Sequence, residues 1–89
     1  MHDAPLDGNA AAGMLSEVFA AEMTVAVTTC ASCGARSQIG RLRAYLQAPG
    51  AVLRCATCDA AQIRLVRGPG RAWLDLRGVR VVEVELPSG

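Results

Sequence analysis

Two short cysteine pairs constrain this chain more than any other feature of its sequence. Cys30 and Cys33 form the first pair, Cys55 and Cys58 form the second, and the 21 residues 34–54 lie between them. Two intervening residues let both sulfurs of a pair face one ion, and a second pair completes a tetrahedron with metal–sulfur distances near ~2.3 Å. Because protein ligands then fill all four positions, such a site is structural and leaves no open position for a substrate.

The sequence favours zinc as the metal, with one ion per chain. A rubredoxin-like iron site is the main alternative, because Gly34 after the first pair leaves room for backbone N–H groups to approach sulfur. The second pair, however, is followed by Asp59, and the chain holds only one Trp, one Tyr and one Phe to pack around an iron. Thioredoxin-like redox chemistry is favoured least, because that motif lies between a strand and a helix and no helical pattern follows either pair.

The small size of the chain agrees with a stabilising metal. At 89 residues it forms one domain, and domains of this size bury too little surface to be strongly stable without help. All four cysteines belong to the two pairs. The first residues lack the basic and apolar segments of a signal peptide, and no stretch approaches the ~20 apolar residues of a membrane span. We therefore expect a cytoplasmic protein with reduced cysteines.

The N-terminal segment predicts a single helix. Residues 1–6 show no periodicity and are expected to form a loose tail, which leaves residues 7–89 as the single domain. Asp7 or Asn9 offers a capping side chain, and the helix should span about residues 9–21. One face of this helix is apolar, with side chains spaced by three and four positions: Ala11, Met14, Leu15, Val18 and Phe19.

After the helix, the sequence indicates antiparallel strands in the order of a zinc ribbon. β-Branched or alternating segments, separated by Gly and Pro turns, predict strands at residues 24–29, 41–47, 51–54, 62–67, 71–77 and 79–86. In the last of these strands, alternation places Val79 and Val82 on opposite faces. We therefore predict a small, mainly β fold with zinc-ribbon-type antiparallel strands and one N-terminal α-helix.

The position of Trp73 depends on the length of the turn at residues 68–70. With a turn of even length, Leu65 opposes Leu74 and Trp73 lies on the more polar face of the hairpin. With a three-residue turn, Leu65 opposes Trp73, which then joins Ile63 in the core, because a slip of one residue exchanges the two faces. Both registers fit the sequence. A core position is favoured for the only tryptophan, and a half-exposed anchor for a partner is the alternative.

All nine basic residues are arginines, and they lie in the part of the chain after residue 35. Arg64, Arg67 and Arg71 cluster around the turn at residues 68–70, as in ribbons that bind nucleic acid. The net charge is only +1, however, and few aromatic residues accompany the arginines. A solvated strand face with ion pairs is therefore favoured. We find no nucleophile–base pair and no glycine-rich phosphate loop, so we do not expect an enzyme.

Several motifs, taken together with the cysteine pairs, resemble a known family. They are Gly34 after the first pair, the Ala-Pro-Gly turn at residues 48–50 and the Gly-Pro-Gly-Arg-Ala-Trp segment that starts at Gly68. From about Asp7 to Glu85, the chain looks like a family of short bacterial zinc-ribbon-like proteins of unknown function. The resemblance implies a metal site at the four cysteines and no characterised activity.

These observations predict a structural zinc-binding ribbon that acts as a protein-interaction or accessory module and not as a catalyst. The helix face or the Trp73 hairpin would dock the partner, because a small ribbon cannot cover every apolar surface. The candidate docking residues are Met14, Leu15, Val18, Phe19 and Trp73. We expect a homodimer or a larger protein partner, with no membrane and no small-molecule substrate. Nucleic-acid binding through Arg64, Arg67 and Arg71 is the alternative, and an iron electron carrier is a more distant one.

Overall fold

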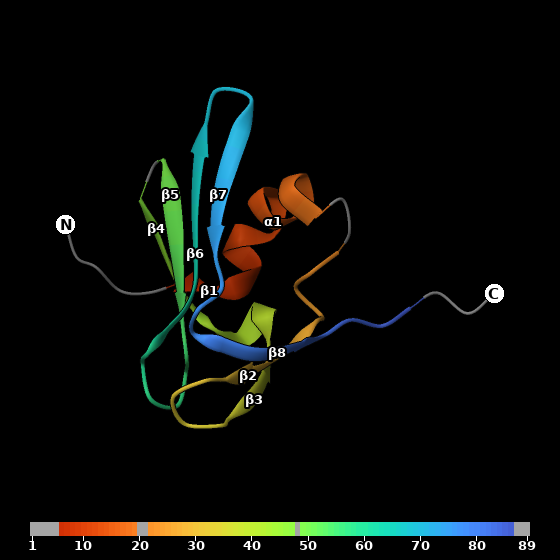
Figure 1. The fold of residues 1–89 in the computed structure, drawn as a ribbon, viewed down its shortest axis with the longest axis vertical. Coiled ribbons are helices and arrows are strands. Elements are labelled where there is room, and N and C mark those ends of the chain that lie inside the picture. Colours follow the sequence, from red (N-terminus) through yellow and green to blue (C-terminus); the bar gives the residue numbers. More distant parts are fainter. Residues whose placement is uncertain (1–5, 20–21, 48, 87–89) are drawn as a thin grey trace.

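The computed structural model describes residues 6–19, 22–47 and 49–86, which form two antiparallel β-sheets and one N-terminal helix (Figure 1). The five-stranded sheet has the order β1-β4-β5-β6-β7, and the three-stranded sheet has the order β3-β2-β8. The strands are β1 (Leu6–Asp7), β2 (Val27–Cys30), β3 (Arg36–Gln38), β4 (Arg43–Gln47), β5 (Gly50–Arg54), β6 (Ala61–Gly68), β7 (Arg71–Asp75) and β8 (Val79–Glu83). The prediction of a small, mainly β, antiparallel fold with an N-terminal helix is confirmed.

The N-terminal helix begins close to its predicted position. Asp7 accepts a hydrogen bond from the N–H of Asn9 at 3.1 Å and caps a 3-10 turn, η1 (Gly8–Ala11). The helix proper, α1 (Ala12–Phe19), follows directly. Residues 20–21, at the end of the predicted helix, lie outside the described residues.

The start of the chain differs from the expected loose tail at one residue. Leu6 pairs with Ala44, which places it in β1 at the edge of the five-stranded sheet. Two residues are too few to show a strand pattern in a sequence, and only the neighbouring β4 reveals this pairing. Residues 1–5 lie outside the described part of the chain.

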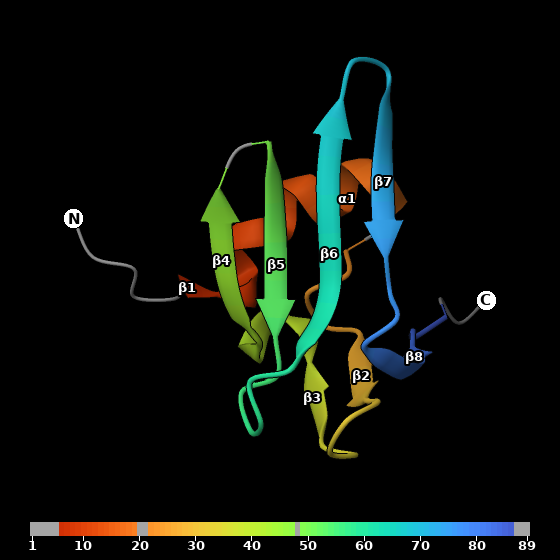
Figure 2. The ribbon, with the colours of Figure 1, turned by 60° about the vertical axis from the view of Figure 1, so that its left-hand side comes forward.

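The core lies between α1 and the two sheets. In Figure 2, α1 runs behind the five-stranded sheet, and no helix of the described part of the chain lies on the face toward the viewer. Leu15 on α1 is 1% exposed and belongs to one cluster with Ile39, Leu42, Leu53 and Ile63. Burying each side chain of this kind contributes ~1.5–3 kcal/mol. The helix therefore covers apolar surface of its own chain.

The segment between α1 and β4 differs most from the prediction. β2 begins only at Val27, because residues 24–25 form a turn. The sequence did not indicate β3 or the second 3-10 turn, η2 (Ile39–Arg41), since such short elements carry no readable periodicity. Ile39 is buried where η2 meets η1, and a Cβ added to Gly8 would lie 1.8 Å from the Ile39 carbonyl oxygen. Only glycine permits this close approach of the two turns.

A bulge in β8 overturns the predicted alternation of its side chains. The pairing of β2 with β8 shifts register between Thr29 and Cys30, which leaves Arg80 as an extra residue on β8. Val79 and Val82 consequently both pack against the core. Simple alternation had placed these two residues on opposite faces, and the inserted residue is the physical reason for the difference.

The β6–β7 hairpin decides the position of Trp73. Its turn contains only Pro69 and Gly70, and Gly70 has a φ of +71°, which glycine adopts without strain. In the resulting register, Leu65 pairs with Leu74. Trp73 therefore lies on the outer face and is 55% exposed. The favoured core position of this tryptophan is wrong.

Candidate metal centre

The strands bring the two cysteine pairs to one end of the molecule. Cys30 is the last residue of β2, and Cys33 lies in the loop that leads to β3. Cys55 and Cys58 lie in the loop that joins β5 to β6. These two loops, residues 31–35 and 55–60, are called the first and second metal loops, and both are at the bottom of Figure 1. Two hairpins from different sheets thus supply one pair of sulfurs each.

The two loops adopt the same turn. The N–H of Gly34 donates to the carbonyl of Cys30 at 2.9 Å, and the N–H of Asp59 donates to the carbonyl of Cys55 at 2.9 Å. The residue after each pair is left-handed, with φ values of +80° at Gly34 and +67° at Asp59. The two pairs therefore present their sulfurs with matching local geometry.

The sulfur positions fit a single tetrahedral ion. All four Sγ atoms lie within 4.8 Å of one another. The Sγ atoms of Cys30 and Cys58 are 3.8 Å apart, and those of Cys33 and Cys55 are 3.7 Å apart. A tetrahedron with metal–sulfur distances of ~2.3 Å has sulfur–sulfur edges of ~3.8 Å, whereas a disulfide requires ~2.05 Å. The four free thiols are therefore arranged as metal ligands and not as disulfides.

Asp59 holds a position where the first loop has glycine. Its carbonyl oxygen accepts a hydrogen bond from Nη1 of Arg54 at 3.0 Å, and its carboxylate lies 3.5 Å from Nη1 of Arg43. A left-handed conformation costs most residues ~1–2 kcal/mol, and Asp is one of the side chains that tolerate it best. The two arginine contacts anchor the loop in this conformation.

Backbone donors favour the thiolate at the two buried cysteines. Burial raises the pKa of Cys55, but the N–H groups of Cys58 and Thr57 outweigh this effect and lower the pKa to about 6. The Thr57 N–H lies 3.4 Å from the Cys55 sulfur. In Cys30, backbone N–H groups of its own loop likewise overcome burial and lower the pKa. The surroundings of both buried sulfurs thus favour the thiolate, which is the form that binds a metal ion.

The surroundings of Cys33, in contrast, disfavour its thiolate. The N–H of Ala35 favours its thiolate, but desolvation and the sulfurs of Cys58, Cys55 and Cys30 oppose it and raise the pKa to about 11. Neighbouring thiolates repel one another, so a thiolate at Cys33 needs a compensating cation. The chemistry of the donor set therefore fits a metal ion held by all four cysteines.

A family model covers almost the whole chain. It describes a family of unknown function, DUF6510, and it matches residues 1–87. The chain belongs to this family. No curated protein and no solved structure gives a significant match. The resemblance to a family without known function is thus confirmed, and DUF6510 itself supplies no activity. Among the described residues, no helix of this DUF6510 chain has the length and apolar character needed to cross a membrane.

A buried polar link beside the metal loops was not foreseen. The hydroxyl of Thr28 on β2 donates to Oε1 of Gln62 on β6 at 2.6 Å, and these residues are 0% and 1% exposed. Within the described residues, Nε2 of Gln62 has no hydrogen-bond partner. The link joins the two sheets two residues before Cys30. Nothing in the sequence pairs these two residues, because they are far apart in the chain and isolated in their segments.

The predicted docking face of the helix is largely turned inward. Leu15 is buried in the core, and Phe19 is half-buried and packs against the same cluster. Met14 is half-buried, and the Val18 side chain lies outside what the structure describes. Among the predicted docking residues with described side chains, Trp73 is the most exposed.

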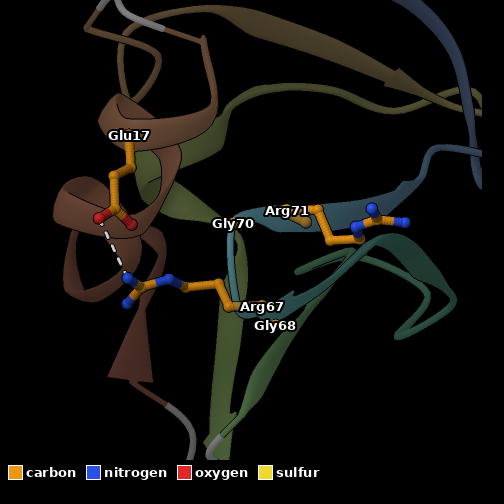
Figure 3. A pocket seen from close by; sticks show the side chains of 6 residues that line it. Glu17, Arg67, Gly68, Gly70 and Arg71 are labelled. Atoms are coloured by element: carbon orange, nitrogen blue, oxygen red, sulfur yellow. Dashed lines mark hydrogen bonds and ion pairs between the residues drawn. The ribbon is translucent and has the colours of Figure 1, made fainter.

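The three predicted nucleic-acid-binding arginines do not converge on one site. Arg67 donates to a carboxylate oxygen of Glu17 at 3.0 Å and so links β6 to α1 across a cleft (Figure 3). Arg71 lines the same cleft, but its side chain points away from this ion pair in Figure 3. Arg64 is exposed and lies opposite Asp75 in the β6–β7 ladder. One of the three charges is thus engaged with the helix, and the others point elsewhere.

The outer face of the five-stranded sheet carries the largest exposed aromatic residue. This surface, the open face, comprises Tyr45, Val52, Arg64, Val66 and Trp73. Trp73 is 55% exposed and Val66 43%. Towards the metal loops, the guanidinium of Arg54 lies 5.8 Å from the centre of the Tyr45 ring. Apolar and aromatic side chains are therefore uncovered here, with arginines beside them.

Proposed function

We propose that this protein is a non-catalytic interaction module whose fold is held by one zinc ion bound to Cys30, Cys33, Cys55 and Cys58. The observation that carries this proposal is the sulfur geometry, with distances of 3.8 and 3.7 Å that match the edges of a four-thiolate tetrahedron. Four protein ligands leave no position for a water or a substrate. The ion would therefore contribute folding energy and no chemistry.

Zinc is favoured over iron because each of the three aromatic side chains has a described contact with a residue other than the cysteines. Tyr45 contacts Arg54, and Phe19 packs against the core cluster. The Trp73 ring covers Gly68 at the far end of the hairpin, where an added Cβ would lie 2.8 Å from Cζ3. A zinc protein is colourless, whereas a ferric four-thiolate site absorbs strongly in the visible range. Metal analysis of the purified protein, combined with an absorption spectrum, distinguishes the two ions.

Removing one ligand tests the structural role of the metal. We expect Cys58→Ser to lose zinc and most of its secondary structure, because apparent binding energies of small zinc sites reach ~10–16 kcal/mol and act as folding energy. Thr57→Ser, which changes a neighbouring residue of the same loop but no ligand, is the matched control and should keep one zinc per chain. A Cys58→Ser variant that stays folded without metal would refute the proposal.

The open face is the surface through which such a module would act. An uncovered apolar patch on a small protein usually marks an interface. Trp73 and Val66 are adjacent there across the β6–β7 ladder. Side-chain contact with a protein partner would lower the exposure of Trp73, whose fluorescence is the only tryptophan signal of the chain.

Binding of single-stranded nucleic acid is a second candidate function. It is favoured by one observation, namely that Tyr45 and Trp73 share the open face with Arg64. Bases stack on such aromatic side chains while arginines contact the phosphates. Affinity for a single strand should then fall with salt by ~0.7 logarithmic units per phosphate contacted for each tenfold increase. We expect only weak, non-specific binding, because Arg67 pairs with Glu17 and the net charge is +1.

A further inference from the structure

β7 is an edge strand. It ends the five-stranded sheet, and among the described residues no further strand lies beyond it (Figure 2). Natural edge strands are usually short or carry charged side chains, especially lysine, or proline or a bulge, which hinders another strand from pairing with them. β1, at the opposite edge, has only two residues. β7 has five residues from Arg71 to Asp75, holds no proline or lysine, and pairs with β6 without a bulge. Its two charged residues, Arg71 and Asp75, have opposite signs and stand at its two ends, so they repel many strands but not one that presents the opposite charges in the same places.

Two residues of β7 direct their backbone N–H and C=O groups away from β6, to the free edge of the sheet. The N–H of Arg67 on β6 donates to the carbonyl of Pro49 at 2.9 Å, so the backbone N–H and C=O groups of Arg67 point away from β7. Because these backbone groups point to alternate sides along a strand, those of Val66 point to β7, and Val66 exchanges hydrogen bonds with its partner Trp73. Ala72 and Leu74, on either side of Trp73, therefore direct their N–H and C=O groups to the free edge.

We propose that two copies of this chain pair through β7, antiparallel about a two-fold axis at Trp73. In this register Ala72 of one copy faces Leu74 of the other, and the two residues exchange hydrogen bonds in both halves of the pair. The two Trp73 residues face each other at the axis. The five-stranded sheets then form one continuous sheet through an isologous interface.

The side chains of β7 are self-complementary in this register. Arg71, Trp73 and Asp75 share the outer face because they alternate with Ala72 and Leu74. Antiparallel pairing about Trp73 places Arg71 of each copy opposite Asp75 of the other. Asp75 already accepts hydrogen bonds from Arg77 at 2.8 Å and lies opposite Arg64 in its own sheet. Arg64 and Asp75 of one copy and Arg71 of the other then form a row of alternating charge across the interface. The two Trp73 residues lie in a neighbouring row, each beside Val66 of its own copy.

The charges select a second copy as the partner, because the same short strand carries the cation at one end and the anion at the other. This inference rests on the proposed interaction function and names its partner. The two proposals fail separately. Absence of zinc would count against the metal-held module, whereas a zinc-loaded protein that remains a monomer would count only against β7 pairing.

The first test combines sedimentation equilibrium with substitution of Ala72. Edge pairs of this size are small and reversible interfaces, so we expect the zinc-loaded wild type to pass from monomer to dimer as concentration rises. Ala72→Pro removes an edge N–H from each copy, and prolines are tolerated at an edge that faces solvent. It should weaken dimerisation at least tenfold, whereas the control Ala72→Ser, which keeps the N–H, should dimerise as the wild type does. Equal dimerisation of both variants would overturn the proposal.

The second test uses charge reversal and does not depend on proline. In homodimers of R71E or of D75R, like charges face each other at both ends of the paired strands, so each variant alone should be monomeric. In an equimolar mixture of the two variants, opposite charges face each other at both ends, and dimers should return. Zinc content and circular dichroism establish that each variant is folded. A mixture that stays monomeric, or a wild type that is monomeric at its highest soluble concentration, would refute β7 pairing.

Discussion

Replacing Gly78 by alanine tests how the segment between β7 and β8 supports the metal loops. This residue passes so close to β6 that an added Cβ would lie 1.8 Å from the carbonyl oxygen of Ala61 and 2.6 Å from Cα of Gln62. These neighbours are backbone atoms, which cannot rotate away. The chain must open by about 1.6 Å to reach an ordinary contact of 3.4 Å. The same glycine accepts a hydrogen bond from the N–H of Ala31, in the first metal loop, at 2.9 Å.

The expected cost follows from these two contacts. Overpacking typically costs ~1–3 kcal/mol, and the upper end applies because both clashing groups are backbone. Loss of the hydrogen bond between Ala31 and Gly78 adds ~0.5–1.5 kcal/mol. We therefore expect Gly78→Ala to lower the free energy of unfolding by about 3.5–4.5 kcal/mol. For a domain of this size, each kcal/mol shifts the melting temperature by ~4–8 °C, so the midpoint should fall by more than about 10 °C.

Thermal and urea unfolding of the metal-loaded protein, followed by circular dichroism, measures this cost. Competition with a chromogenic chelator shows in parallel whether the metal leaves the variant faster. Gly13→Ala is the matched control, because a Cβ on Gly13 meets nothing within 4 Å. That substitution in α1 should stabilise the protein by ~0.8–1 kcal/mol. If Gly78→Ala unfolds within about 0.5 kcal/mol of the wild type, the close approach to β6 does not constrain the fold as argued.

Two further substitutions probe the second metal loop and the helix. Asp59→Val should be about 1–2 kcal/mol less stable than Asp59→Gly, because only glycine and a few polar residues accept the left-handed conformation at this position; equal urea midpoints for the two variants would contradict this. Leu15→Ala should cost about 2–5 kcal/mol without changing the sedimentation of the folded protein, because Leu15 is 1% exposed and covers its own chain. A Leu15→Ala variant of unchanged stability but altered assembly would place this residue at an interface instead.

The sequence was sufficient for features that depend on neighbours along the chain. The spacing of Cys30 and Cys33, and of Cys55 and Cys58, indicated one metal site because two intervening residues bring two sulfurs to one side of a turn. The start of the helix near Asp7 could also be read directly, since a cap and the first turn are local. The polar link between Thr28 and Gln62 could not, because it joins isolated residues of different sheets.

Tertiary structure alone decided which side chains are covered. In a strand, successive side chains point to opposite faces, so one residue gained or lost reverses every later position. The two-residue turn at Pro69 and Gly70 placed Trp73 outside, and the extra residue Arg80 brought Val79 and Val82 to the same side. Periodicity marks the strands but not these single-residue differences. The bulge in β8 is set by pairing with β2, which is distant in the sequence, whereas the position of Trp73 is set by the turn that the β6–β7 hairpin adopts. Both are decided only when the strands pair, and together they determine which surface remains open to a partner.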